Sequence, residues 1–411
     1  MSTNFRIACR FLTAKKRAMT MSLACTVLGV ALFIVTQATT SGIEKLFFRA
    51  IIGADGAISI EDRFQSTLRT ISAGSLSKRG SPEGQKFIAG VDEPASVMEA
   101  LGKFGGVTGM SQVVRGDVLV SSSFKNDPAQ IFGIEIDQHV KVSGLERQIV
   151  AGELEDFRRT PSGVLMGREL ADRLQLGVGD SFLIEAQKEW RPFRVSAIYE
   201  TGISAYDQVR VFVHLGEARS MLKRPRGVTL IQLQLRDPDR AVEEAAHIEQ
   251  VIGHTAKPWQ KRERVWGDVF RALRVSSGIV VTVFTLIASL AMFNTLAMLV
   301  MEKTRDIAIL RSMGYERRDI TAIFMWQASI VLAVGATLGS LLGFGLTWAV
   351  SMLPLELRGI IVTKTYPVDG SPWHYVAAIG TAVVMVTIAS IIPARRAARL
   401  EPGDIVRGSA Q

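Results

Sequence analysis

The sequence predicts an α-helical membrane protein with four transmembrane helices and a large α+β domain outside the membrane. Three observations support this fold class. Hydrophobic residues make up 48% of the 411 residues and concentrate in four blocks. A bilayer core requires about 20 mostly apolar residues per helix, and each block reaches that length. Between the first and second blocks, residues 41–271 have the composition of an ordinary globular domain, long enough to fold by itself.

The predicted spans cover residues 18–40, 275–300, 320–353 and 373–392. A secretory signal peptide is the alternative for the first block, because a basic start and an apolar core fit both. The block is long for a signal core, and no small-x-small cleavage site follows it at Ser41-Gly42-Ile43-Glu44-Lys45. A membrane span is therefore the favoured interpretation.

The third span carries glycine at every fourth position, at Gly335, Gly339 and Gly343. Such a row of small residues lets a second helix approach closely. Membrane helices are also rich in glycine in general, which is the alternative explanation. We favour close helix packing along this row.

Lysine and arginine predict the orientation. The segment 1–17 is basic and holds no acidic residue, and the loop 301–319 and the tail 393–411 are rich in arginine. The only lysine or arginine residues in the loop 354–372 are Arg358 and Lys364. Cytoplasmic flanks of membrane proteins carry the excess of basic residues. Both termini and the loop 301–319 are therefore expected in the cytoplasm, and residues 41–271 in the periplasm. The net charge of +9 is explained in this way without a nucleic-acid partner.

The external domain reads as mixed α and β. Predicted strands are Asp117–Val120, Gln130–Ile136, Ser181–Glu185, Phe193–Tyr199, Val209–His214 and Thr229–Leu235, and predicted helices are Ala95–Phe104, Gly167–Leu174 and Pro238–Ile252, the last capped by Asp237. Phe64–Lys86 reads as a loop or a mobile flap. The domain contains no cysteine, since Cys9 and Cys25 precede it, which excludes a disulfide framework there.

No enzymatic site is predicted in this domain. Its histidines, His139, His214, His247 and His254, lack the spacing of metal ligands. The Gly-x-Ser-x-Gly and His-Glu-x-x-His motifs do not occur. We therefore expect no catalytic residue and no metal site.

The loop between the second and third spans predicts a short capped helix. Thr304 is a suitable N-cap, Arg305 to Met313 can form the helix, and Gly314 suits the left-handed position that ends it. Asp319 can cap the third span. Ile307, Leu310 and Met313 or Gly314 share one face, with no lipid or core partner in view. A surface loop with ordinary membrane-flanking charge is the alternative, but it does not explain the apolar stripe. We predict a docking surface for a cytoplasmic partner.

Two motifs carry a family resemblance. Residues 302–320 read EKTRDIAILRSMGYERRDI and resemble the EKTR-[DE]-I-x-I-L-R-x-[ML]-G motif of FtsX/MacB-type ABC-transporter permeases. Residues 392–402 read IPARRAARLEP and resemble the PARRAA-x-x-x-P tail of the same family. The order of one span, a large external domain and three further spans also matches, so the resemblance covers essentially the whole chain.

Within this superfamily the chain looks most like the LolC/LolE lipoprotein-releasing type. The segments that carry this match are Leu28–Ala31, Ser41–Lys45, Gly133–Glu135, Gly163–Ala171, Phe193–Val195, Tyr199–Gly202 and Tyr206-Asp207. These matches are looser than the loop and tail motifs.

The resemblance implies a mechanism and partners. Two permeases pair, as a homodimer or with a related chain, and a dimer of cytoplasmic ATPase subunits docks on the short helices. ATP-driven motion passes through the spans to the external domains, and a periplasmic carrier or adaptor protein receives the substrate. The coupling residues implied in this way are Glu302, Arg305, Asp306, Ile307, Leu310, Arg311, Met313 and Gly314. The chain itself binds no cofactor, and ATP and Mg²⁺ act through the partner ATPase.

One absence agrees with this interpretation. The chain has no Gly-x-x-x-x-Gly-Lys-Ser/Thr loop with which to cradle ATP phosphates. Some MacB-type relatives carry an ATPase fused at the N-terminus, whereas 17 residues precede the first predicted span here.

Three functions remain open at this stage. Release of lipoproteins from the inner membrane is favoured; a MacB-like envelope exporter and an FtsX-like regulator that transports nothing are the alternatives. The external domains of FtsX-type regulators are much smaller than residues 41–271. A groove for acyl chains could be lined by Leu32, Phe33, Val35, Val280, Val281 and Phe284, although any span helix would look similarly apolar.

Overall fold

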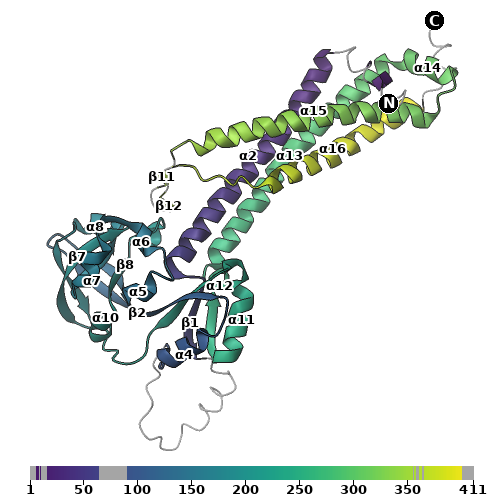
Figure 1. Ribbon diagram of the computed structural model, residues 1–411. Helices are drawn as coiled ribbons and strands as arrows, with labels where there is room; N and C mark the ends of the chain where they lie inside the picture. Colours follow the sequence, from purple (N-terminus) through teal and green to yellow (C-terminus); the bar gives the residue numbers. More distant parts are fainter. Residues whose placement is uncertain are drawn as a thin grey trace, which may run out of the picture. The chain divides into compact units, whose positions relative to one another are not determined.

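The computed structural model describes residues 6–8, 10, 16–63, 90–354, 356–357, 361–362 and 365–399 (Figure 1). The loop predicted at Phe64–Lys86 and the residues after Arg399 lie outside these ranges, as does Cys9. The chain forms two compact units. The helical unit comprises residues 1–45, 269–354 and 365–411, and the α+β unit comprises residues 46–268 and 355–364.

Among the described residues, four helices are long and apolar enough to cross a membrane. They are α2 (Lys16–Asp55), α13 (Arg264–Glu302), α15 (Arg317–Ser351) and α16 (Pro372–Ala398), and the short helix α14 (Thr304–Ser312) joins α13 to α15. Helices α2 and α13 are each unbroken, and residues of both belong to both units. They exceed the predicted spans because the prediction followed the apolar blocks alone, whereas the helices continue through charged residues such as Glu44 and Lys45.

Helix α16 also runs past its predicted end. Residues 393–398, which were predicted to belong to a tail, form its last turns, with Pro393 inside the helix. Ala394, Ala397 and Ala398 are buried, while Arg395 and Arg396 between them are exposed. Small residues on one face bring this end of α16 close to its neighbours, and the arginines remain accessible.

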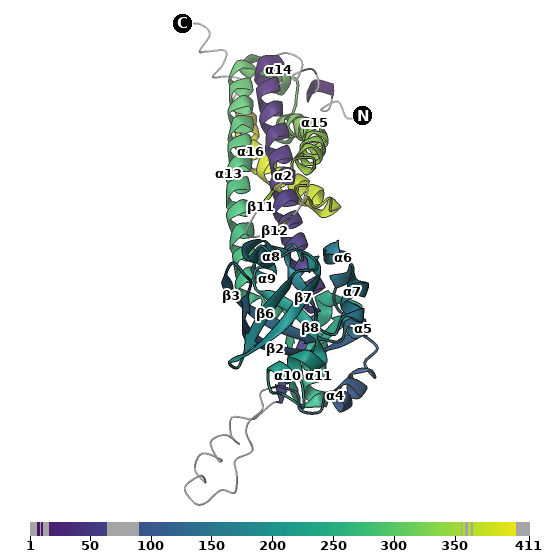
Figure 2. The same ribbon diagram turned by 90° about the vertical axis from the view of Figure 1, so that its left-hand side faces the viewer.

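The glycines of α15 lie on the face that contacts α2, and the two helices run side by side (Figure 2). A Cβ atom added at Gly335 would lie 2.8 Å from Cγ2 of Thr26, and one at Gly339 would lie 2.8 Å from Cβ of Val30. A Cβ at Gly343 would lie 3.1 Å from Cβ of Ile34. These distances are shorter than normal van der Waals contact, so glycine permits this separation of the backbones.

A second close approach lies at the other end of α2. An added Cβ at Gly42 would overlap the carbonyl group of Pro367. The backbone N–H of Asp369 donates to the carbonyl oxygen of Ala38 at 2.9 Å, and the carboxylate of Asp369 pairs with Lys45 at 2.7 Å. The segment that precedes α16 is thereby attached to α2 within the helical unit.

The α+β unit contains a ten-stranded sheet. Its strands are β1 (Ile58–Arg63), β2 (Val107–Ser121), β3 (Asn126–Ile134), β4 (Ile149–Gly152), β5 (Gly163–Gly167), β6 (Ser181–Ala186), β7 (Glu189–Tyr199), β8 (Arg210–His214), β9 (Leu230–Leu235) and β10 (His254–Pro258). A separate pair consists of β11 (Glu356–Leu357) and β12 (Ile361–Val362).

Strand β2 divides the sheet into two parts. Its first half, residues 107–113, pairs with β9, which leads through β1 to β10. Its second half pairs with β3, and the pairings β3–β8, β8–β5, β5–β7, β7–β6 and β6–β2 return to β2. Six of the described strands therefore form a closed ring; β9, β1 and β10 extend from β2, and β4 pairs with β7.

Short helices complete this unit. They are α4 (Pro94–Leu101), α5 (Ile136–His139), α6 (Leu145–Gln148), α7 (Leu154–Arg159), α8 (Arg168–Leu174), α9 (Ser204–Asp207), α10 (Leu215–Met221), the 3₁₀ turn η1 (Pro238–Arg240), α11 (Ala241–Ile252) and α12 (Trp259–Arg262). Buried aliphatic residues from β2, β5, β8 and β9 form the main core with α8 and α11.

The predicted strands and helices of this domain are confirmed. The six predicted strands fall within β2, β3, β6, β7, β8 and β9, apart from a few terminal residues. Asp237 caps the predicted helix at Pro238–Ile252, accepting a hydrogen bond of 3.1 Å from the N–H of Asp239. The structure divides that helix into η1 and α11. The short strands β1, β4, β5 and β10 were not predicted; β1 and β10 pair with each other.

Candidate functional site

Helix α14 begins almost directly after α13, with only Lys303 between them. Thr304 was predicted to be the N-cap of this helix, but it is the first residue of the helix, and Lys303 is the N-cap. The hydroxyl of Thr304 donates to the carbonyl oxygens of Val300 at 3.0 Å and Met301 at 2.7 Å. Its side chain thus joins α14 to the last turn of α13, which leaves little freedom at this corner.

The end of α14 is fixed by a glycine, as predicted. Gly314 has a φ of +97°, in the left-handed region that suits glycine. Its N–H donates to the carbonyl of Arg311 at 3.1 Å, and the N–H of Tyr315 donates to that of Leu310 at 3.2 Å. This pair of hydrogen bonds defines a Schellman motif. Helix α15 then starts with a capping box, in which Asp319 accepts from the N–H of Glu316 at 3.2 Å.

One prediction about α14 is wrong. Ile307 and Leu310 were expected to form an apolar stripe without a core partner. Ile307 is only 1% exposed and packs in a cluster with Leu296, Val300 and Phe324, and Leu310 is partly buried against the same cluster. Their apolar character is explained by packing inside the helical unit, so these two side chains do not form an outward docking face.

The opposite face of α14 is accessible. Arg305, Ile309 and Met313 follow one another at intervals of four residues, and all three are exposed, as is Glu302 at the end of α13. Ile309 is 51% exposed and Met313 is 72% exposed. We call Arg305, Ile309 and Met313 the outer face of α14. Ile309 was not identified from the sequence, because the more regular stripe of Ile307 and Leu310, which is buried, was predicted to be the docking surface.

Polar contacts hold α14 against its neighbours. Asp306 accepts from the ammonium group of Lys303 at 2.8 Å. Arg311 donates from Nη1 to the carbonyl oxygen of Ala398, at the end of α16, at 3.3 Å. Among the predicted coupling residues, Asp306, Ile307, Leu310 and Arg311 therefore position the helix, and Glu302, Arg305 and Met313 are presented outward.

The predicted groove residues are not equivalent in the structure. Phe33 lines a small hollow between α2, α13 and α16 together with Thr285, Ala288 and Ser289. Val281 is buried, whereas Val280 and Phe284 on the same helix are 50% and 46% exposed. Leu32 and Val35 are half-buried. The six side chains thus point to different surroundings.

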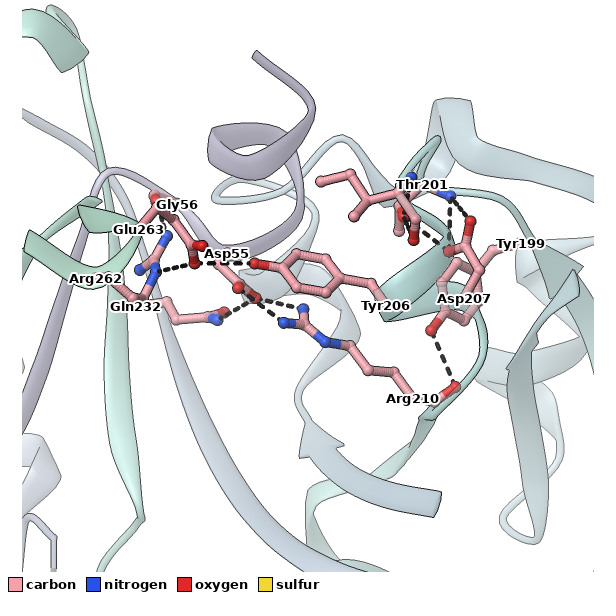
Figure 3. Close-up of polar contacts among 11 residues, drawn as sticks. Asp55, Gly56, Tyr199, Thr201, Tyr206, Asp207, Arg210, Gln232, Arg262 and Glu263 are labelled. Atoms are coloured by element: carbon pink, nitrogen blue, oxygen red, sulfur yellow. Dashed lines mark hydrogen bonds and ion pairs between the residues drawn. The ribbon is translucent and has the colours of Figure 1, made fainter. Parts of the chain in front are cut away.

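A buried polar network lies in the α+β unit where α2 ends (Figure 3). The carboxylate of Asp55, the last residue of α2, accepts two hydrogen bonds from the guanidinium of Arg210 on β8, at 2.6 and 2.9 Å. Gln232 on β9 donates to the same carboxylate at 3.3 Å. Both charged side chains are about nine-tenths buried. A bidentate pair of this kind fixes position and orientation together.

Aromatic and acidic groups extend this network toward α13. The guanidinium carbon of Arg210 lies 3.4 Å from the ring centroid of Tyr206 and 4.9 Å from that of Phe132. The hydroxyl of Tyr206 donates to Glu263, the residue before α13, at 3.1 Å. Arg262 donates to the carbonyl of Gly56 at 3.1 Å. The end of α2 and the start of α13 are therefore joined to the sheet through one set of side chains.

Sequence reasoning did not identify this network. One local signal was available, because a carboxylate at the C-terminus of a helix opposes the helix dipole and needs a positive partner when buried. Tyr206 and Asp207 were noted only as part of the family resemblance. The partner Arg210 lies 155 residues from Asp55, beyond the reach of any local pattern.

Two further titratable groups are buried beside this network. Burial lowers the pKa of His139 to about 4, and its Nδ1 lies 3.1 Å from the hydroxyl of Ser111. Burial raises the pKa of Asp207 to about 6, although Thr201 donates to this carboxylate from its N–H at 3.0 Å and from its hydroxyl at 2.8 Å. Both side chains are 1% exposed.

These two groups have opposite effects on stability in mild acid. Asp207 takes up its proton in the folded state near pH 6 and in the unfolded state near its ordinary pKa of 3.8, so it adds stability as the pH falls between these values. His139 stays neutral in the folded state down to about pH 4 but is protonated near pH 6.5 in the unfolded state, so it removes stability over nearly the same range. Each effect amounts to about 3 kcal/mol.

In the wild type the effects of Asp207 and His139 nearly cancel. Their combined contribution to the free energy of unfolding should therefore change little between pH 6.5 and 4. Asp207→Asn should lose about 3 kcal/mol over that range, and His139→Asn should gain a similar amount. The measurement is denaturant unfolding of the detergent-solubilised chain, followed by tryptophan fluorescence. The readout is the slope with pH, since both substitutions also change the absolute stability. Parallel slopes for all three proteins would contradict these protonation states.

Among the residues that the structure describes, no group of three or more His, Cys, Asp or Glu side chains is placed to hold a metal ion. Two of the histidines considered as metal ligands in the sequence have protein partners instead. Nε2 of His214 lies 2.8 Å from the carbonyl oxygen of Phe157, and the His247 ring contacts Phe104 edge to face.

Comparison with known proteins identifies the family. The model described as "MacB-like periplasmic core domain" matches residues 19–251, and that described as "FtsX-like permease C-terminal" matches residues 278–402. A protein of Xylella fastidiosa named "Lipoprotein-releasing system transmembrane protein LolC" is 25% identical over 438 aligned positions, which cover 98% of each chain.

Two other relatives cover less of the chain. The LolE protein of the lipoprotein-releasing system of Haemophilus influenzae is 26% identical over 73% of this chain and 77% of its own length. A protein of Hyphomonas neptunium named "Macrolide export ATP-binding/permease protein MacB" is 24% identical over 60% of this chain and 38% of its own length. The first family model covers more than half of the sequence, and the two matches together span both units. The chain belongs to the ABC-transporter permeases with a MacB-like periplasmic core domain and an FtsX-like C-terminal region, and within them it is of the LolC/LolE and MacB type.

Proposed function

We propose that this permease couples ATP hydrolysis by a separate cytoplasmic ATPase to release of lipoproteins from the inner membrane on the periplasmic side. The outer face of α14 is the observation that carries the coupling part of this proposal. Its exposed apolar side chains, Ile309 and Met313, stand on a helix whose other face is buried and whose two ends are fixed by hydrogen bonds. A partner that binds this face can move the attached helices as one body.

Membrane insertion in the predicted orientation is part of the proposal. The four long helices expose many large apolar side chains, such as Leu341, Phe344 and Trp348, each more than half exposed. Water is an unfavourable environment for such a surface, and acyl chains would cover it. The arginines that follow α13 and precede α15 support a cytoplasmic location for this end by the positive-inside rule. The α+β unit then lies in the periplasm.

Transmission through the membrane rests on α2 and α13. Both are unbroken helices with residues in both units, and both end at the polar network of Asp55, Arg210 and Glu263. We propose that movement of these helices reaches the sheet through this network. The ATPase supplies the ATP and Mg²⁺ site, a second permease completes the complex, and a periplasmic carrier accepts the substrate.

Lipoproteins are the favoured substrate class because the relative aligned over 98% of the chain is named as part of a lipoprotein-releasing system. Export of other molecules is the second candidate, because the relatives named as macrolide exporters match about 60% of the chain. The exporters match a smaller share of this sequence, so release of lipoproteins is preferred.

The test is reconstitution of the permease with its ATPase and partner permease in proteoliposomes that hold a triacylated lipoprotein. Addition of ATP and a soluble periplasmic carrier should transfer the lipoprotein to the aqueous phase. The same protein without its acyl chains serves as the control and should not stimulate ATP hydrolysis. ATP-dependent transport of a macrolide without any lipoprotein transfer would instead favour the exporter.

A further inference from the structure

A hollow lined with arginine lies between the first turns of α15 and the last turns of α16. Its lining consists of Arg317, Arg318, Thr321, Ala322 and Met325 from α15 and Arg395, Ala398 and Arg399 from the end of α16, and its volume is about 460 Å³. We call it the arginine hollow. It lies beside the outer face of α14 in the chain but shares no residue with it.

The charge of the arginine hollow is unbalanced. Arg317, Arg318, Arg395 and Arg399 are all exposed, and none of them has an ion pair with a carboxylate among the residues that the structure describes. The lining contains no acidic residue. Guanidinium groups that converge from two helices favour an anion with several oxygen atoms, because each can donate two parallel hydrogen bonds to it.

The remaining lining is apolar apart from Thr321, whose hydroxyl donates to the carbonyl oxygen of Arg317. Met325 is eight positions beyond Arg317 on α15, which corresponds to about 12 Å along the helix axis. Ala322 lies between them. The hollow therefore has a cationic rim at the first turn of α15 and an apolar wall that continues along this helix into its apolar span.

We propose that the arginine hollow binds an anionic phospholipid, with the phosphate between the four arginines and the upper part of an acyl chain against Ala322 and Met325. A cationic rim over an apolar wall fits an amphiphile, whereas a free anion would use the rim alone. Basic pockets between transmembrane helices bind anionic headgroups in this way. The proposal does not depend on the transported substrate, and it holds whichever side of the membrane this end faces.

The test uses the full chain purified in detergent and titrated with phosphatidylglycerol or phosphatidylcholine, with bound lipid counted by native mass spectrometry. Arg395→Gln should weaken binding of phosphatidylglycerol about fivefold, and Arg318→Gln combined with Arg395→Gln should weaken it more than tenfold. Binding of phosphatidylcholine should not change. Arg396→Gln is the matched control, because Arg396 is exposed on the same turn but does not line the hollow.

Four outcomes would overturn the proposal. Equal effects of Arg395→Gln and Arg396→Gln would mean that lipid binding depends on the total positive charge of this end and not on the arginine hollow. Complete displacement of the lipid by millimolar inorganic phosphate would assign the rim to a free anion. Loss of the ATPase subunit in the Arg318 and Arg395 variants, with lipid binding unchanged, would assign it to a protein partner. Tighter lipid binding by a chain that ends at Arg399 would mean that the acidic residues of the C-terminal segment are the occupant of the rim in the full chain.

Discussion

Ile309→Asp should abolish stable association with the ATPase subunit while leaving the permease folded. Ile309 is half exposed at the centre of the outer face of α14, so a carboxylate there can reach water in the free permease. In the complex the same carboxylate would be buried against the partner and would lose this contact with water. Central interface residues contribute about 2 kcal/mol or more, so affinity should fall by roughly 30-fold or more. Co-purification, with ATPase activity assayed on the eluate, measures the loss.

Two control variants separate docking from folding. Ile309→Leu keeps an apolar side chain of equal size and should retain the ATPase. Ile307→Asp places a charge in the buried cluster with Leu296 and Phe324, and should lower the melting temperature as well as the association. If Ile309→Asp keeps full ATPase association, the outer face of α14 is not the docking surface. If it also lowers the melting temperature as much as Ile307→Asp, Ile309 is a packing residue.

Asp55→Ala should be the most destabilising single change in the α+β unit among those considered. It leaves the guanidinium of Arg210 buried without its carboxylate, and breaking a buried ion pair in this way costs about 3–5 kcal/mol. Asp55→Leu combined with Arg210→Met removes both charges and fills similar volume, so it should regain most of that loss. Denaturant unfolding of the wild type, the single variant and the double variant measures these differences.

The double variant also tests the proposed role in transmission. It should bind the ATPase normally, because α14 is untouched, but ATP hydrolysis should no longer drive release of lipoprotein. The directional contacts among Asp55, Arg210 and Tyr206 are absent even though the core is filled. Normal release by a stable double variant would mean that the ion pair contributes stability alone. Reduced release together with reduced stability would leave its role structural.

The features that were predicted correctly are those encoded by neighbouring residues. Continuous apolar blocks identified the four long helices, and alternating β-branched residues identified six strands. The cap at Asp237 and the helix end at Gly314 follow from the chemistry of one side chain and of one backbone angle. Each of these signals lies within a few positions in the chain.

The features that were missed depend on distant partners. The pairing of β1 with β10 joins Ile58 to Pro258, and the ion pair joins Asp55 to Arg210. The direction in which α14 faces is a similar case. The spacing of Ile307 and Leu310 shows that they share a face, but only the positions of α13, α15 and α16 decide that this face is buried.

The closed ring of strands in the α+β unit limits how this unit can bind other chains. Strands whose backbone groups are paired on both sides cannot accept a further strand. Within the ten-stranded sheet, only β10 and β4 pair with a single neighbour, namely β1 and β7. A substrate or carrier that met this unit elsewhere would have to be recognised by side chains and by the shape of the surface. Among the described strands of this sheet, strand addition, which is indifferent to sequence and can lead to aggregation, is confined to these two short edges.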